Sequence, residues 1–124
     1  MELIVFYSFT HENEYTDYVE ELAIKESKEK ALLYLLLLDE VCKQHMYEIY
    51  DFKLKRINTD VISRSWQTES SLKTIRLMFM ITNCYPPDEC NNVNLYSICT
   101  ILKSDYAEYY LEALRIWLGI VDIK

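Results

Sequence analysis

Glycine and proline are scarce in this chain of 124 residues, which contains one glycine and two prolines. Hairpins and tight turns draw on glycine, so its scarcity argues against an all-β or loop-rich domain. Neither GxGxxG nor GxxxxGK can be written with Gly119 alone. Nucleotide binding through a glycine-rich phosphate loop is therefore excluded.

Long hydrophobic runs and export signals are missing too. The longest apolar run, Ala31 to Leu38, is far shorter than the roughly 20 residues that a membrane helix requires. The apolar stretch from Leu3 to Tyr7 is too short for a signal peptide and follows an acidic start. We therefore expect a cytoplasmic protein without membrane contact, whose four cysteines are reduced thiols.

Helical periodicity dominates the remaining sequence. Hydrophobic residues make up 51% of the chain, and they recur with the 3.6-residue spacing of amphipathic helices. We predict a single all-α domain over residues 1–124, built as a compact bundle of about five helices. The expected helices begin after a cap at Thr10, after Ser27, at Ser71 after a cap at Thr68 or Ser70, at about Leu95, and after a cap at Ser104.

The second of these helices is expected at the centre of the bundle, because its segment Ala31–Leu38 is apolar on every face. It should run to about Gln44, with a further turn over His45–Tyr50, and the last helix should end at Gly119. The predicted core includes Leu35, Leu38, Trp66, Ile75, Phe79, Leu114 and Trp117.

Strand signals are few. Phe52–Ile57 alternates in polarity, and the ends Leu3–Phe6 and Ile120–Ile123 are apolar enough for a minor two-stranded β pairing at the termini. The clearest loop is Tyr85–Asn92, because two consecutive prolines deny a helix its backbone donors.

Charge is uneven along a chain whose net charge is −7. Acidic residues dominate residues 1–52, whereas basic residues outnumber acidic ones over residues 53–76. An acidic half can steer a basic partner, although amphipathic helices also need polar outer faces. The residues expected to contact a protein partner are the acids of the first helix and of the proline loop, Glu12, Glu14, Asp17, Glu20, Glu21, Asp88 and Glu89.

The basic strip over residues 53–76 supports an alternative, a nucleic-acid-associated regulator. Its cations are interleaved with Tyr50, Phe52 and Trp66, and they are Lys53, Lys55, Arg56, Arg64, Lys73 and Arg76. Phosphate binding needs a basic face, and the overall acidity of the chain makes nucleic acid the less favoured partner.

Catalytic and metal-binding patterns are weak. Cys42, His45, Cys84 and Cys90 could together supply four zinc ligands, but their spacing is loose, no CxxC occurs, and cysteine is often a plain buried hydrophobe. His11 and His45 are the only histidines, and neither has a glycine-flanked nucleophile beside it in sequence. We expect no enzyme activity and no cofactor.

Tyrosine is the unusual component, with 11 residues. Tyrosine is common at protein interfaces, but most of these tyrosines fall on apolar helical stripes, where their rings pack in a core. A stripe wider than one core can absorb would be covered in a homodimer, so a monomer and a homodimer both remain open.

Several segments resemble a family of small helical proteins of unknown function from low-G+C Gram-positive bacteria and their phages and plasmids. The resemblance covers most of the chain in the same order. The matching segments are Phe9–Tyr15, Ile49–Phe52, Ser65–Thr68, Arg76–Phe79, Asn83–Tyr85 and Glu112–Trp117. In the family pattern the histidine follows the acids, whereas His11 precedes them, so the resemblance assigns no role to His11.

The resemblance implies a genomic setting, because the family has no known reaction, substrate or cofactor. Small acidic proteins on mobile elements are often inhibitors of host defence, including CRISPR nucleases. The function expected from this setting is a non-enzymatic inhibitor that binds a larger protein, such as a nuclease effector complex.

Overall fold

The computed structural model describes residues 3–86 and 98–122, and the prediction of a mainly helical fold is confirmed. The described elements are α1 (Phe9–Glu21), α2 (Ser27–Leu38), α3 (Glu40–Gln44), α4 (Met46–Ile49), β1 (Tyr50–Asp51), β2 (Arg56–Ile57), the 3-10 helix η1 (Thr59–Ser63), α5 (Glu69–Thr82), α6 (Ile98–Leu102) and α7 (Ala107–Trp117). No described helix has both the length and the apolar character that crossing a membrane requires.

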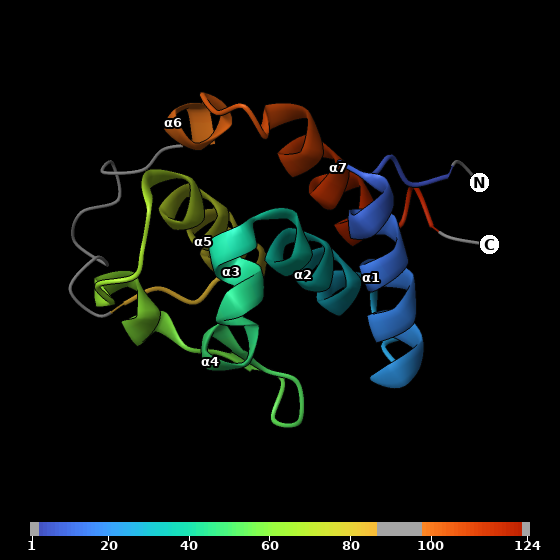
Figure 1. The fold of residues 1–124 in the computed structure, drawn as a ribbon, viewed down its shortest axis with the longest axis horizontal. Helices are drawn as coiled ribbons and strands as arrows, with labels where there is room; N and C mark the ends of the chain where they lie inside the picture. Colours follow the sequence, from blue (N-terminus) through green and yellow to red (C-terminus); the bar gives the residue numbers. More distant parts are fainter. Residues whose placement is uncertain (1–2, 87–97, 123–124) are drawn as a thin grey trace.

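Helix α2 lies in the middle of the molecule, as its apolar sequence predicts. Figure 1 shows α1 on one side of α2 and α3 and α5 on the other, and α7 also packs against it. Every side chain of Ala31–Leu38 is at most 4% exposed. A helix that is apolar all round needs neighbours on all faces, and this requirement organises the bundle.

Helix α2 ends earlier than predicted. It stops at Leu38, and a separate helix α3 begins after Asp39, whose backbone is extended. The Asp39 carboxylate accepts hydrogen bonds from the backbone N–H groups of Val41 and Cys42 at 3.0 and 3.1 Å. An aspartate that caps the next helix competes with continuation of the first one, which explains the break.

The minor β pair is present, but the two-stranded sheet does not lie at the termini. Strands β1 and β2 form an antiparallel hairpin in which Tyr50 faces Ile57, and at the termini the described residues show only a single bridge residue, Val121. The alternating stretch Phe52–Ile57 is mostly the turn of this hairpin. Asp51 Oδ1 closes the turn by accepting from the N–H groups of Lys53 and Leu54 at 2.9 Å each.

Helix α5 is capped by Thr68, one of its two predicted caps. The Thr68 hydroxyl accepts from the Ser71 N–H at 3.0 Å, and the Ser71 hydroxyl in return accepts from the Thr68 N–H at 2.8 Å. Asn83 ends the helix in the left-handed conformation, with φ of 55°. The helix starts at Glu69, two positions before the predicted Ser71.

The other caps are partly as predicted. Ser8 rather than Thr10 caps α1, by accepting from the His11 N–H. Ser104 forms a turn before α7 instead of capping it, because its hydroxyl accepts from the Tyr106 N–H. Gly119 follows α7 with φ of +74°, and the Ile120 N–H returns to the Arg115 carbonyl at 3.0 Å, which confirms the predicted glycine end. Of the predicted helix over 95–102, residues 98–102 form α6 and the rest lie outside the described residues.

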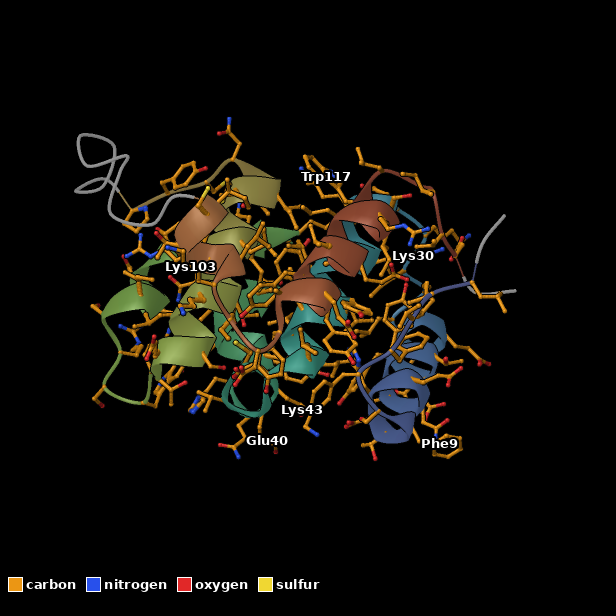
Figure 2. The ribbon with its side chains drawn as sticks, turned by 90° about the horizontal axis from the view of Figure 1, so that it is seen from above. Phe9, Lys30, Glu40, Lys43, Lys103 and Trp117 are labelled. Carbon is orange, nitrogen blue, oxygen red and sulfur yellow. The ribbon has the colours of Figure 1, made fainter. Side chains whose placement is uncertain are left out.

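The predicted core is correct for Leu35, Leu38, Ile75 and Phe79, which are buried. Trp66 and Leu114 are only half-buried, and the prediction for Trp117 is wrong, because this side chain is 38% exposed on the outside of α7 (Figure 2).

The N-terminal segment, residues 3–8, explains why the buried face of α7 is shifted. It is held beside α7 by the Val5 N–H, which donates to Glu112 Oε2 at 2.6 Å, and by the Tyr34 hydroxyl, which donates to the Val5 carbonyl at 2.7 Å. Glu112 and Ile116 therefore become buried, and the centre of the buried face moves away from Leu114 and Trp117.

This shift predicts opposite sensitivities for two adjacent residues. Ile116→Ala should lower the free energy of unfolding by about 2–5 kcal/mol, because it leaves a cavity in the core. Trp117→Ala should cost less than half as much, because its ring is already in partial contact with water. Urea unfolding of the two variants checks this, and a larger loss for Trp117→Ala would contradict the described packing of α7.

Candidate functional site

The acidic face of α1 is the predicted interaction site that the structure describes most fully. Helix α1 contains no lysine or arginine. Its buried side, which carries His11 and Tyr15, packs towards α2, and the acids occupy the remaining faces. Four of them are exposed, and these residues, called the acidic face below, are Glu12, Asp17, Glu20 and Glu21.

Glu14 differs from the other acids of this helix. It is half-buried, and the Lys43 ammonium lies 3.0 Å from Glu14 Oε1 and 3.3 Å from Glu40 Oε2. This contact joins α1 to α3, so Glu14 has a structural partner.

Phe9, at the start of α1, is 78% exposed and points away from the bundle (Figure 2). The other predicted contact residues, Asp88 and Glu89, lie outside the described residues.

His11 is a buried structural histidine. Its Nδ1 accepts from the Tyr7 N–H at 3.1 Å, and since a backbone N–H can only donate, Nε2 carries the proton and donates to the Tyr34 carbonyl at 2.9 Å. Burial is the main cause that lowers the pKa of His11 below its usual 6.5. The neutral ring therefore fastens the N-terminal segment to α2, and sequence reasoning gave no sign of this role.

The lowered pKa gives stability a defined pH dependence. As pH falls below about 6.5 the unfolded chain binds a proton at His11 before the folded chain does, so the free energy of unfolding should fall with pH in this window and be fully restored above it. Urea unfolding between pH 7 and pH 5 measures this. His11→Gln should flatten the dependence. Equal slopes for wild type and His11→Gln would refute the assignment.

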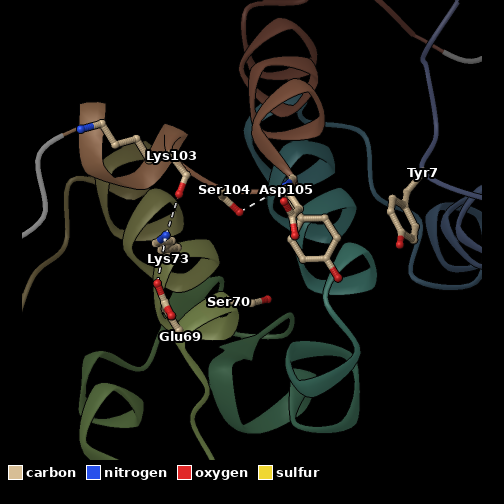
Figure 3. A pocket seen from close by; sticks show the side chains of 8 residues that line it. Tyr7, Glu69, Ser70, Lys73, Lys103, Ser104 and Asp105 are labelled. Carbon is tan, nitrogen blue, oxygen red and sulfur yellow. Dashed lines mark hydrogen bonds and ion pairs between the residues drawn. The ribbon is translucent and has the colours of Figure 1, made fainter.

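The polar pocket lies where α5 and α7 begin, beside the N-terminal segment. It encloses about 450 Å³ and is lined by Tyr7, Glu69, Ser70, Lys73, Lys103, Ser104, Asp105 and Tyr106 (Figure 3). Lys73 Nζ donates to the Lys103 carbonyl at 2.7 Å and lies 3.4 Å from Glu69 Oε1. Its ammonium is therefore engaged by groups of the chain itself.

Ser70 connects this pocket to a buried polar cluster centred on Asp39, which is 3% exposed. Besides capping α3, the Asp39 carboxylate accepts from the Ser70 hydroxyl in the first turn of α5. Thr74, one turn further along α5, is hydrogen-bonded to the Tyr110 hydroxyl of α7 at 2.8 Å. The cluster thus connects three helices through paired polar groups, which is the condition for burying them.

The serine and thiol of this cluster and the two histidines of the chain have separate partners. Ser70 is paired with a carboxylate, and neither histidine lines the polar pocket. His45 instead stacks on Trp66, with ring centroids 3.9 Å apart and planes inclined by 4°. Burial, reinforced by the neighbouring Asp39 charge, raises the pKa of the Cys42 thiol well above its usual range. A thiol in this state is a poor nucleophile and a poor metal ligand.

The four residues that could have supplied zinc ligands are not brought together in the part of the chain that the structure describes. Cys42 is buried and Cys84 is exposed. Cys90 lies outside the described residues. Within residues 3–86 and 98–122, no group of three or more histidine, cysteine, aspartate or glutamate side chains is placed to hold a metal ion.

The basic strip is partly neutralised by the chain itself. Lys55 lies 3.1 Å from Glu26, Arg64 lies 2.6 Å from Glu48, and Lys73 is held in the polar pocket. Lys53 and Arg56 are exposed on the hairpin. The structure therefore offers phosphate groups fewer accessible cations than the sequence suggests, which weakens the nucleic-acid alternative.

Asp39 gives a second prediction. Asp39→Ala should lower the free energy of unfolding by about 2–4 kcal/mol, because it removes a helix cap and leaves buried donors without an acceptor. Asp60→Ala, at an exposed aspartate, is the matched control and should cost far less. Chemical unfolding of both variants gives the comparison. A loss for Asp39→Ala no larger than the control's would show that the cluster is not structural.

The chain belongs to the family of unknown function DUF6075, whose model matches residues 1–119. This match confirms the expectation that the chain is a member of a family without an assigned function. No curated protein matches the chain, and neither does any solved structure.

Proposed function

We propose that this member of the family is a non-enzymatic protein-binding module whose acidic face on α1 engages a basic surface of a larger protein. The proposal depends on the distribution of charged residues on helix α1. The acidic face is exposed and α1 has no basic residue of its own, whereas Glu14, the acid that turns inward, is paired with Lys43. A surface whose charges are all negative favours association with a positively charged surface of a partner.

A nucleic-acid-binding protein is the partner class that fits best, because its substrate channel must present cations to phosphates. A host defence nuclease belongs to this class of partner. An inhibitor of such a nuclease, carried by a phage or plasmid of a low-G+C Gram-positive bacterium, would need an acidic surface to bind it. We include that setting in the proposal, together with action in the cytoplasm as a monomer or homodimer. The paired groups around Asp39 and the buried Cys42 thiol support a non-catalytic role, because the chain uses them for packing.

Two variants with the same net charge test the acidic face. One carries Glu12→Gln, Asp17→Asn and Glu20→Gln, and the control carries Asp60→Asn, Glu69→Gln and Glu108→Gln at exposed acids elsewhere. The probe is a fluorescein-labelled nona-lysine peptide, and anisotropy gives its Kd. At low salt the α1 variant should bind roughly tenfold more weakly than wild type, and the control should bind much more tightly than the α1 variant.

Salt dependence completes the test. Raising the salt concentration should weaken the binding of wild type and bring the two variants together, because screening acts on exposed charges. Equal loss in both variants would show that only total charge matters and would contradict the proposal. Binding of a labelled single-stranded RNA that is abolished by Lys53→Glu and Arg56→Glu would support the nucleic-acid alternative instead.

A further inference from the structure

An aromatic groove opens between the end of α1 and the α4–hairpin region. It encloses about 590 Å³ and is lined by Glu21, Leu22, Tyr47, Tyr50, Asp51, Phe52 and Lys53. In Figure 1 the lower end of α1 and the hairpin both project on the same side of the molecule, below α2. The groove lies at the C-terminal end of the acidic face, with which it shares Glu21.

Three rings form the walls of the groove. The centroids of Tyr47 and Phe52 lie 6.0 Å apart with planes inclined by 70°, and those of Tyr50 and Phe52 lie 4.9 Å apart at 80°. Both pairs are therefore in edge-to-face contact. The negative faces of such rings attract cations, and a planar guanidinium can also stack on them.

The rings are held in place before any partner arrives. The Tyr50 hydroxyl donates to the buried Glu29 carboxylate at 2.7 Å. Tyr47 contacts the Phe52 ring edge-to-face, although its side chain is 63% exposed. Preorganised walls reduce the entropy that binding must overcome, so exposed aromatic area here favours recognition.

Carboxylates lie on both sides of the groove. Glu21 comes from α1; burial is the main cause that raises the pKa of Tyr47, and the Glu21 charge adds to it. Asp51 comes from β1. Its Oδ1 atom accepts the two hydrogen bonds that close the hairpin turn, and its Oδ2 atom accepts neither of them. Lys53 also lines the groove and its side chain is exposed, so the lining carries two negative charges and one positive charge. Charge in the groove therefore favours a cationic occupant over an apolar or anionic one.

We propose that the aromatic groove receives an arginine side chain from a basic segment of the protein partner, with its guanidinium stacked on Tyr47, the most exposed of the three rings, and paired with Glu21 or Asp51. This inference rests on the proposed function, which it deepens by naming the anchoring residue of the partner. Lysine would gain less from the same groove, because its compact ammonium neither stacks on the rings nor binds a carboxylate in a two-pronged manner.

The test compares labelled nona-arginine with the nona-lysine peptide of equal charge. Wild type should bind the arginine peptide roughly three- to tenfold more tightly. Tyr47→Leu and Glu21→Gln should each bring the two affinities together, whereas Tyr85→Leu, at an exposed tyrosine away from the groove, should preserve the preference. Circular dichroism and the melting temperature establish that each variant is folded.

The outcomes separate the two proposals. If wild type has no arginine preference, or if Tyr47→Leu retains it, the groove inference is wrong, while the effect of Glu12, Asp17 and Glu20 on nona-lysine binding still decides the proposed function. If the preference depends on Tyr47 and Glu21 but the α1 variant binds like its control, the groove is the site and the acidic face is not. If neither peptide binds, both proposals fail.

Discussion

The Asp39 carboxylate is the polar contact on which the arrangement of the bundle depends. Helix α2 is apolar on all faces and must be surrounded, which requires the chain to turn sharply at its end. Asp39 makes that turn by capping α3, and its second oxygen accepts from Ser70 at the start of α5. The hydrogen bond between Thr74 and Tyr110 extends the connection to α7. A buried cluster in which some polar groups lacked hydrogen bonds would lower the free energy of unfolding. Its side chains therefore serve to hold the helices together.

Other buried polar side chains also have structural hydrogen-bond partners. His11 fastens the N-terminal segment, Glu112 accepts from the same segment, and Glu29 fixes Tyr50. The side chains that are left to contact other molecules lie on the surface of the protein. The acidic face and the aromatic groove adjoin at Glu21, so a single basic partner can cover both. Charge would bring the partner to α1, and the groove would fix one of its side chains.

The elements that sequence predicted well are those set by local physics. The burial of Ala31–Leu38 follows from their composition, the start of α5 follows from its cap Thr68, and the end of α7 follows from Gly119. The elements that it missed depend on contacts between distant segments. Glu112 is buried because Val5, 107 positions away in sequence, donates to it, and this contact also turns Trp117 outward. The exposed acids of α1 could be predicted from helical spacing, whereas the groove could not, because it joins α1 to a hairpin.

Amide hydrogen exchange, followed by NMR under native conditions, tests most directly whether Asp39 holds the bundle together. The informative amides are those of Val41 and Cys42, which donate to Asp39, with the Leu35 amide in the middle of α2 as the reference. If the cluster is part of the cooperative core, all three should exchange only through global unfolding, with the same free energy of opening. Exchange at Val41 and Cys42 through a much easier local opening, with Leu35 still protected, would contradict the account.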